Sequence, residues 1–308
     1  MGKDSIHIFS PATVANVSCG YDVLGFCLDT VGDEMRISKT SKKGIHITKI
    51  QNYDLPYEAD KNVAGVSALA LLDELDLDFG FEIEITKNIK PGSGIGSSSA
   101  SAAGSVVAIN ELLGRPFNAT QLTQFAMKGE ALASGSEHAD NIAPAIFGGF
   151  TLVKSIQPLQ ILQLPTPPDL FATVIHPEVE VKTSEARAIL PKDIPLKKAI
   201  NQWANVGSLV HGLHTSDYSL ISQALEDVIV EPYRKKLIPN FQNLKSETLK
   251  AGALGCGISG SGPSVFTLSK GKEIAEQVAK VMDDVFKNSG LNYNIYVSPI
   301  NKQGVKTL

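Results

Sequence analysis

The chemistry that the sequence suggests first is phosphate binding, by the stretch PGSGIGSSSASAAG at Pro91–Gly104. Gly92, Gly94 and Gly96 let successive backbone N–H groups turn toward one point, and three serines, 97 to 99, follow at once. The N–H groups at a helix start have no partner within the helix, and the helix dipole favours an anion there. A strand, a glycine loop and a serine-rich helix start therefore predict a phosphate cradle.

This loop differs from the two common nucleotide motifs. It contains no Lys, so it lacks the Gly-Lys-Ser/Thr ending of the Walker loop, and its third glycine departs from the dinucleotide-binding spacing. The competing interpretation is a flexible connection before a tightly packed helix of small residues. Spacing alone leaves both interpretations open.

Two other glycine-rich stretches lie beside expected strands. PATVANVSCGYDVLGF occupies residues 11–26, after a strand expected over 5–9, and CGISGSGPSVF occupies 256–266, leading into a strand expected over 264–268. Taken singly, each is more typical of an ordinary turn than of a binding site. Their order along the chain, with the loop of 91–104 between them, is the more specific observation.

Taken together, the three stretches resemble the motifs of the galactokinase–homoserine kinase–mevalonate kinase–phosphomevalonate kinase superfamily. With SEHADNIAPAIFGG at 136–149, they are most similar to the homoserine kinases, and the galactokinase signature is absent. The resemblance covers the chain from end to end. It implies phosphoryl transfer from ATP to L-homoserine, a step toward threonine, with Mg²⁺.

The resemblance implies a nucleotide site with a metal beside it. Ser98 and Glu130 match the family's Mg²⁺ ligands, and both offer the hard oxygen atoms that Mg²⁺ prefers. Without the family, Glu130 could equally be an ordinary exposed helical residue. The residues expected to bind ATP are Pro91, Gly92, Ser93, Gly94, Ile95, Gly96, Ser97, Ser98, Ser99 and, at the nucleoside, Asn62.

For an amino-acid substrate, the resemblance implies Asp22 at the ammonium group, with Asn16 nearby, and Arg187 and Arg234 at the carboxylate. Composition supports the arginines, because only four of the 28 basic residues are Arg. In a chain that otherwise uses Lys, an Arg suggests a bidentate carboxylate contact. His138 matches a further substrate contact in the family.

The expected catalytic residues are Glu130, Asn141 and Ser98. Several superfamily members place an Asp base where this chain has Asn141, and an amide cannot accept the hydroxyl proton. Homoserine kinases share this absence, so Asn141 is expected to orient the substrate. Phosphoryl transfer needs mainly positioning and charge stabilisation, to which Lys87 could add, and the proton could leave to a γ-phosphate oxygen or to solvent.

Strands and helices alternate in both halves of the chain, which predicts an α+β fold. Helices are expected over 61–75, with Asp60 as N-cap, and over 97–113, 120–134, 209–225, 238–251 and 273–287. Strands are expected over 34–38, 44–50, 79–87, 150–154, 170–176 and 293–299.

Four prolines within 157–169 indicate a boundary between residues 1–156, the nucleotide-binding domain, and residues 157–308, with the substrate site at their interface. The resemblance implies the superfamily's two-domain small-molecule kinase fold. Its first domain has a left-handed βαβ unit beside the phosphate-binding loop, and its C-terminal domain is ferredoxin-like α+β.

Composition excludes some functions. The chain has 308 residues, 43% of them hydrophobic and 19% charged, with a net charge of −4, so we expect no basic surface for nucleic acid. The uncharged run 91–110 is too rich in Ser and Gly to enter a membrane. Three cysteines without framework spacing favour a reducing cytoplasm. The resemblance implies a homodimer.

Two alternatives stay open at this stage. A sister kinase could act on another small alcohol, such as mevalonate, although that substrate lacks an ammonium group and would leave Asp22 without a partner. A catalytically silent nucleotide-binding regulator could use the same fold. The presence of both Ser98 and Glu130 argues against the silent regulator, which could lose metal ligands freely.

Overall fold

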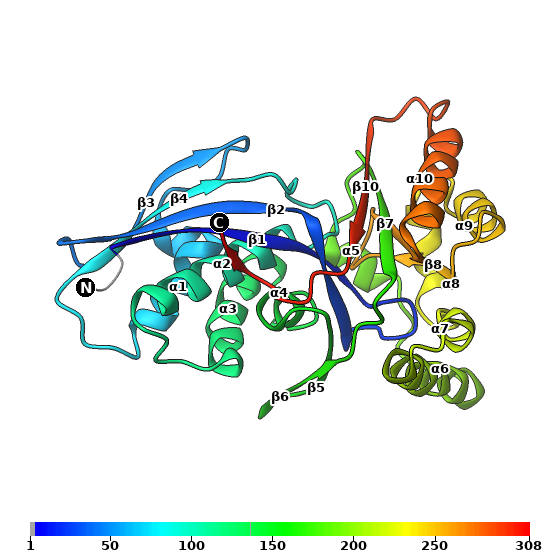
Figure 1. Cartoon of the computed structure of the whole chain (residues 1–308), viewed down its shortest axis with the longest axis horizontal. Coiled ribbons are helices and arrows are strands. Elements are labelled where there is room, and N and C mark those ends of the chain that lie inside the picture. Colours follow the sequence, from blue (N-terminus) through cyan, green and yellow to red (C-terminus); the bar gives the residue numbers. More distant parts are fainter. Residues whose placement is uncertain (1–3, 136) are drawn as a thin grey trace.

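The computed structural model describes residues 4–135 and 137–308, and it contains two sheets that lie end to end (Figure 1). Within these residues the first sheet has seven strands, in the order β11-β1-β2-β4-β3, with β5 pairing with β2 and with β6. The strands are β1 (Ser5–Ala15), β2 (Leu24–Thr40), β3 (Gly44–Gln51), β4 (Gly80–Thr86), β5 (Phe150–Ile156), β6 (Leu159–Leu164) and β11 (Lys306–Thr307).

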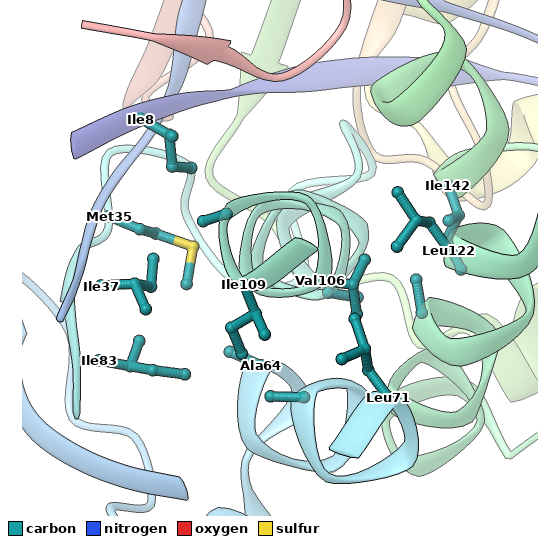
Figure 2. Close-up of a cluster of buried hydrophobic side chains, with 14 of the residues drawn as sticks. Ile8, Met35, Ile37, Ala64, Leu71, Ile83, Val106, Ile109, Leu122 and Ile142 are labelled. Carbon is teal, nitrogen blue, oxygen red and sulfur yellow. The ribbon is translucent and has the colours of Figure 1, made fainter. Parts of the chain in front are cut away.

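Four helices pack on one face of the first sheet (Figure 1). Alternation along β4 turns Phe81, Ile83 and Ile85 inward, into a buried cluster shared with the central helix α2. Within it, Ile83 faces Ile109 of that helix (Figure 2). The helices are α1 (Val63–Leu72), preceded by the short η1 (Ala59–Lys61), α2 (Ser97–Leu112), α3 (Ala119–Ser134) and α4 (Ile142–Phe147).

The second sheet has the antiparallel order β10-β7-β9-β8, formed by β7 (Leu170–Pro177), β8 (Gly255–Ile258), β9 (Val265–Lys270) and β10 (Tyr293–Pro299). This order, with helices α9 (Phe241–Lys250) and α10 (Lys272–Phe286) between the strands, is the ferredoxin-like arrangement that we expected. The remaining elements between β7 and β8 are α5 (Thr183–Ala188), α6 (Leu196–Thr215), α7 (Tyr218–Ala224), α8 (Glu231–Arg234) and η2 (Lys235–Leu237).

Most of the expected elements are present, with shifted ends. The expected cap of the first helix is wrong, because Asp60 lies in η1 and the side chain of Asn62 accepts from the Ala64 N–H at 3.0 Å. Helix α6 begins at Leu196, well before the expected residue 209. Strands β3 and β4 pair in parallel and α1 lies between them in the chain, as in a βαβ unit, while its left hand stays a prediction.

The expected boundary at residue 156 falls in the turn between β5 and β6. These two strands pair along their whole length, from Phe150 opposite Leu164 to Ile156 opposite Leu159. Near the C-terminus, β11 pairs with β1 of the first sheet. We therefore propose 165–169 as the link between the two halves, with the last residues returning to the first sheet.

Candidate active site

A cavity of about 410 Å³ lies where the glycine-rich loop before α2 meets residues of the second half of the chain. Leu55, Pro56 and Val63 form an apolar part of its wall, and Gly260 and Ser261 contribute from the third glycine-rich stretch. All predicted site residues except Ser93 and Ile95 line it: Asn16, Asp22, Asn62, Pro91, Gly92, Gly94, Gly96, Ser97, Ser98, Ser99, Glu130, His138, Asn141, Arg187 and Arg234.

The loop has the backbone form that its glycines predict. Gly92, Gly94 and Gly96 have φ of 75°, 79° and 71°, a region that side chains with a Cβ rarely adopt. Gly96 is the N-cap of α2, so the first N–H groups of that helix face the end of the loop. This arrangement can bind an anion such as phosphate.

Ser93 and Ile95 are each only 1% exposed and do not line the cavity. Their carbonyl oxygens fix the loop instead: that of Ser93 accepts from the Ser264 hydroxyl at 2.6 Å, and that of Ile95 accepts from the Thr13 N–H at 3.0 Å. The Ser259 hydroxyl donates to the Gly94 carbonyl at 2.7 Å. Because their side chains are buried away from the cavity, Ser93 and Ile95 can contribute to binding only through their backbone.

The two expected metal ligands lie together. Glu130 Oε2 accepts hydrogen bonds from the hydroxyls of Ser98, at 2.8 Å, and Ser99, at 2.9 Å. Burial raises the pKa of the Glu130 carboxyl, and the two serine hydrogen bonds oppose that rise. A carboxylate beside two hydroxyls is a set of hard oxygen donors.

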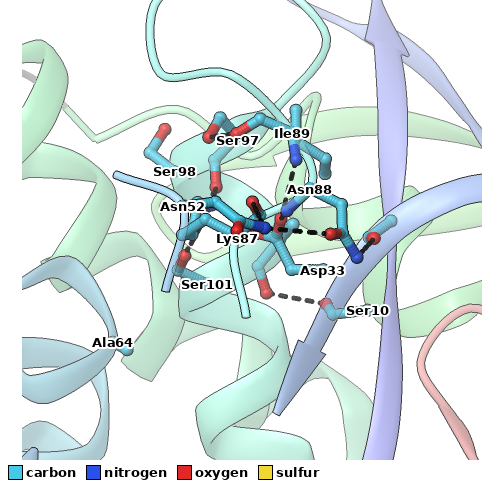
Figure 3. A network of polar contacts seen from close by, with 12 residues as sticks. Ser10, Asp33, Asn52, Ala64, Lys87, Asn88, Ile89, Ser97, Ser98 and Ser101 are labelled. Atoms are coloured by element: carbon cyan, nitrogen blue, oxygen red, sulfur yellow. Dashed lines mark hydrogen bonds and ion pairs between the residues drawn. The ribbon is translucent and has the colours of Figure 1, made fainter. Parts of the chain in front are cut away.

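Lys87 lines the cavity and is paired with a buried carboxylate. Its Nζ forms a buried ion pair with Asp33 and donates to the Ser97 carbonyl at 2.8 Å and to Ser101 Oγ at 3.0 Å (Figure 3). Burial lowers the pKa of Lys87 and raises that of Asp33, and their mutual attraction opposes both shifts. Lys87 therefore anchors the start of α2, and its contribution to neutralising phosphate stays a prediction.

The side chain of Asn62 has a structural role. Its side chain is 5% exposed and is held at both ends, since Oδ1 caps α1 and Nδ2 donates to the Pro56 carbonyl at 2.8 Å. It thereby fixes Pro56 and Val63, which line the cavity beside it. A direct contact of Asn62 with a nucleoside stays a prediction.

Asp22 and Arg187, expected at the ammonium and the carboxylate group of the substrate, contact each other. Arg187 donates two hydrogen bonds to the Asp22 carboxylate, at 2.8 and 3.1 Å, and its Nη2 lies 3.1 Å from Nε2 of His138. Asp22 has a φ of 60°, and its N–H donates to Asn16 Oδ1 at 3.0 Å. Burial, followed by the charge of Arg187, lowers the pKa of His138.

Arg234 is 2% exposed and is held by backbone acceptors. Its Nε donates to the Ala186 carbonyl and its Nη1 to the Gly260 carbonyl, both at 3.0 Å. The guanidinium lies 5.0 Å from the ring centre of Tyr21, and that of Arg187 lies 5.8 Å from the same ring. One aromatic ring therefore contacts both arginines.

Asn141 is oriented by a neighbouring strand. The Thr13 hydroxyl donates to Asn141 Oδ1 at 2.7 Å, so the –NH₂ group is the part of the amide that can be offered to a substrate oxygen. Asp140, the preceding residue, is 5% exposed and lines the same cavity. Burial first, and then the charges of Asp22 and Glu130, raise the pKa of Asp140 from 3.8 to about 7.

The chain matches the family models for the GHMP kinases N-terminal domain over residues 62–149 and the GHMP kinases C-terminal domain over residues 209–288. It is 46% identical to a homoserine kinase of Chlorobium phaeobacteroides, over 97% of this chain and 98% of the relative. The chain belongs to the homoserine kinase family of the GHMP kinases. A relative in that family from Chlorobaculum tepidum is 44% identical over 97% of each chain.

Solved structures agree with this family membership. A crystal structure of homoserine kinase from Cytophaga hutchinsonii is 51% identical, with a TM-score of 0.95 over 99% of this chain and 98% of that one. Mevalonate kinase of L. major has a TM-score of 0.72 over 97% of this chain and 99% of that one, at 16% identity, and shares the fold alone. Among the described residues no helix has the length and apolar character needed to cross a membrane.

Three residues that line the cavity or contact its lining residues were not predicted from the sequence: Tyr21, Thr13 and Asp140. Tyr21 and Thr13 lie inside the first glycine-rich stretch, so membership of that stretch was the available signal. Asp140 lies beside Asn141, but nothing in the sequence distinguishes a buried carboxylate from the exposed one that is more usual. Its burial emerges from the packing of α4 against the first sheet.

Proposed function

We propose that the protein transfers the γ-phosphoryl group of ATP to the hydroxyl of L-homoserine, forming ADP and O-phospho-L-homoserine for threonine biosynthesis. One observation carries the proposal: a single cavity joins a helix start suited to phosphate with charged groups suited to an α-amino acid. Asp22 would bind the ammonium group, and Arg187 and Arg234 would bind the carboxylate. The names of its relatives, homoserine kinase, support the same activity.

The loop 91–99 would bind the triphosphate mainly through backbone N–H groups, since it contains no Lys and Lys87 is paired with Asp33. Glu130 and Ser98 would hold Mg²⁺, which when bound offsets negative charge on the phosphate oxygens. The hydrogen bonds that already join Glu130 to Ser98 and Ser99 support this assignment, because they gather hard donors at the helix start.

In the reaction, the homoserine hydroxyl oxygen forms a bond to the γ-phosphorus while the bond from that phosphorus to the β,γ-bridging oxygen breaks. ADP leaves with the electron pair of the broken bond, and the hydroxyl proton passes to a phosphate oxygen or to solvent. Asn141, held by Thr13, would donate from its –NH₂ group to the attacking oxygen and so fix its direction. His138 would contact the substrate near its carboxylate, beside Arg187.

Substrate binding would replace the contact between Asp22 and Arg187 with contacts from each of them to the substrate. The Asp22–Arg187 ion pair must open, after which the ammonium and carboxylate groups of homoserine replace each lost partner. A ligand that carries only one of the two charges would leave the other residue of the pair uncompensated. The site should therefore discriminate in favour of zwitterions.

A coupled ADP-release assay tests the proposal, with L-homoserine, aminopropanol, 4-hydroxybutyrate and mevalonate as acceptors. We expect turnover with homoserine and turnover at least tenfold lower with each of the others. Glu130→Gln should lower kcat by on the order of a hundredfold, because charge stabilisation is lost. Preference for mevalonate would indicate a sister kinase, and ATP binding without any turnover would indicate a silent regulator.

We place the enzyme in the cytoplasm. Cys19, Cys27 and Cys256 are all buried free thiols, and burial raises the pKa of each to about 12. Free thiols without a disulfide framework fit a reducing compartment.

A further inference from the structure

Gln202 is an unusual residue to find on the buried side of a helix. Of residues 196–205 of α6, all of which the structure describes, Gln202 alone is buried. It is 8% exposed, whereas Leu196, Ile200 and Trp203 are 68%, 47% and 57% exposed. A helix ordinarily buries apolar residues, and an amide that leaves water needs hydrogen-bond partners. The partners of this amide therefore indicate its role.

The amide of Gln202 joins two segments that are far apart in the sequence. Its Nε2 donates to the Cys19 carbonyl at 2.9 Å and to Asp227 Oδ1 at 3.0 Å. Its Oε1 accepts from the Val228 N–H at 3.0 Å, so both ends of the amide are fixed. The connection from β1 to β2, which contains Cys19, reaches the part of the molecule that carries α6 and α7 (Figure 1).

On one side Gln202 holds the turn 16–22, which carries Asp22. Four non-glycine residues of this turn have φ between 40° and 71°, in the left-handed region: Asn16, Val17, Ser18 and Asp22. Such residues are strained and persist only where their surroundings fix them. The hydrogen bond from Gln202 reaches the turn at Cys19, in its middle.

On the other side Gln202 holds the start of α8. The Asp227 carboxylate accepts from three successive N–H groups, those of residues 229 to 231, at 2.8 to 2.9 Å. It thereby satisfies free N–H groups at the start of the short helix that ends at Arg234. Gln202 donates to the same carboxylate and so fixes the position of that helix start.

We propose that Gln202 is a positioning residue of the amino-acid site, which sets the separation between the turn that carries Asp22 and the helix that carries Arg234. The proposal rests on the proposed function, in which Asp22 binds the ammonium group of homoserine and Arg234 its carboxylate. In an α-amino acid these two groups are bonded to the same carbon atom. A site that binds both must therefore keep its own two groups at one matching separation.

Other contacts between the turn and α8 use the guanidinium of Arg234. Its Nη2 donates to the Tyr21 hydroxyl at 3.3 Å. Its Nη1 donates to the Gly260 carbonyl at 3.0 Å, and Nδ2 of Asn16 donates to the same oxygen at 2.7 Å. A substrate carboxylate would compete for this guanidinium. The hydrogen bonds of Gln202 end instead on a backbone carbonyl and on a helix-capping carboxylate, so they stay in place when Arg234 changes partners.

Packing alone does not set the distance between the two segments. A small cavity of about 10 Å³ is lined by Asn16 and Ser18 of the turn and by Val230 and Arg234 of α8 and its N-cap. Apolar contact is therefore incomplete between them. This leaves the separation to hydrogen bonds, of which Gln202 supplies those that reach both sides.

Steady-state kinetics of the full chain test this role. Gln202→Met keeps the length of the side chain but removes the amide, so the turn and α8 become free to vary their separation. Homoserine must then restore the separation when it binds, and its KM should rise at least tenfold. Once bound, the substrate itself joins the two groups, so kcat should change less than threefold, and the KM for ATP should change less than twofold.

Asn205→Leu is the matched control. Asn205 also lies on α6, and its Nδ2 donates to the Glu226 carbonyl at 3.0 Å, one residue before Asp227. Because that hydrogen bond ends on Glu226 rather than on the turn, the variant should keep both KM values within twofold. A purely structural role of Gln202 would lower the melting temperature without separating the two KM values.

A second substitution tests whether Gln202 acts through Asp227. Asp227→Asn replaces one accepting oxygen by a donating –NH₂ group at the start of α8, so it should also raise the KM for homoserine. Two residues that act through one set of hydrogen bonds are not additive. The double variant should therefore have a KM within about threefold of that of Asp227→Asn alone. Multiplied effects would show that the two residues act independently and would overturn the proposal.

Hydrogen exchange of the ligand-free proteins tests the positioning apart from the activity. The N–H groups of Asp22, Val23 and Leu24 are hydrogen-bonded within or beside the turn, and in Gln202→Met they should exchange at least tenfold faster. Exchange in 91–100 should be unchanged. Unaltered exchange in the turn, or equal changes of both KM values, would overturn the role of Gln202. If the unchanged protein does not phosphorylate homoserine, the proposed function is wrong, and the exchange result alone decides whether Gln202 holds the turn.

Discussion

At the scale of single residues, Tyr21 contacts two groups of like charge, the guanidinium groups of Arg187 and Arg234. Its ring lies 5.0 Å from the Arg234 guanidinium and 5.8 Å from that of Arg187, and its hydroxyl accepts from Arg234 at 3.3 Å. A ring face attracts a cation, and desolvation strengthens that attraction. Tyr21 therefore offsets the repulsion between the two guanidinium groups that we propose bind one carboxylate.

Tyr21→Leu should raise the KM for homoserine about tenfold while changing the KM for ATP little. Two contacts of cation–π type are lost, each worth about 0.5 to 2 kcal/mol, and a tenfold change corresponds to about 1.4 kcal/mol. Tyr21→Phe keeps the ring and should have a much smaller effect. Steady-state kinetics with each substrate varied provides the measurement. Equal changes in both KM values would contradict this role.

Asp140 gives the stability of the ligand-free protein a pH dependence. Its pKa is about 7 in the fold and near 3.8 when unfolded, so between these values the folded state holds a proton that the unfolded state has lost. The carboxyl therefore destabilises the fold progressively as pH rises from about 4 to 7, and fully above that. The difference corresponds to at most about 4 kcal/mol.

Asp140→Asn removes this titration. The variant should melt at nearly the same temperature as the unchanged protein at pH 4, and at increasingly higher temperature as pH rises to 8. Thermal melts across that range, without ATP or homoserine, give the difference in melting temperature between the two proteins. Other titrating groups affect both proteins equally and so drop out of this difference. A difference that is constant with pH would contradict the raised pKa of Asp140.

The family resemblance pointed to residues far apart in the sequence that the fold brings together. Asp22, Arg187 and Glu130 all line one cavity, while their roles stay predictions. The ion pair of Lys87 was not predicted, because its partner, the buried Asp33, lies on a distant strand. A partner 54 residues away cannot be read from local spacing.

At the scale of elements, the three glycine-rich stretches form one unit. The third stretch supports the loop through the hydroxyls of Ser259 and Ser264, and the first supports it through Thr13. Gly94 is placed so that a Cβ would lie 2.5 Å from the Gly262 carbonyl oxygen. The glycines thus serve close approach between stretches as well as the turns themselves.

Gly94→Ala should therefore weaken ATP binding at least tenfold, because the added Cβ forces either the loop or the backbone at Gly262 to move. Gly92→Ala is the matched control: its φ is also positive, at 75°, but its Cβ would meet nothing within 4 Å. It carries the conformational strain alone, roughly 1 to 2 kcal/mol. Calorimetric titration with ATP separates the two variants, and equal losses of affinity would show that contact with Gly262 is unimportant.

Local patterns predicted elements best where one face is buried and the ends carry clear signals. Helix α3 was expected over 120–134, and it spans Ala119–Ser134, with Gly135 as its C-cap in the left-handed region. The first half of α6 was missed, and in it the apolar residues Leu196, Ile200 and Trp203 lie exposed rather than on a buried face. Strand β6 was missed because prolines on both sides of it suggested a linker.

At the scale of the whole molecule, the two sheets share a continuous core. One buried cluster includes Phe26 and Phe150 of the first sheet together with Phe266 of the second. The Phe26 ring lies 4.9 Å from that of Phe150 and 5.8 Å from that of Phe266. The C-terminal strand β11 also returns to β1, so the first sheet contains chain from both ends.

The shared core leads to a prediction about unfolding. Scanning calorimetry of the ligand-free protein should give one transition, with calorimetric and van't Hoff enthalpies in agreement, because neither half can lose the cluster alone. Phe26→Ala should cost about 3 to 5 kcal/mol and move the whole transition to lower temperature without splitting it. Phe241→Ala, a substitution of equal size in the separate cluster beneath α9, should have the same consequence for the single peak. If Phe26→Ala instead divides the peak into two, or if the unchanged protein already shows two, the halves unfold independently and the continuity of the core does not couple them.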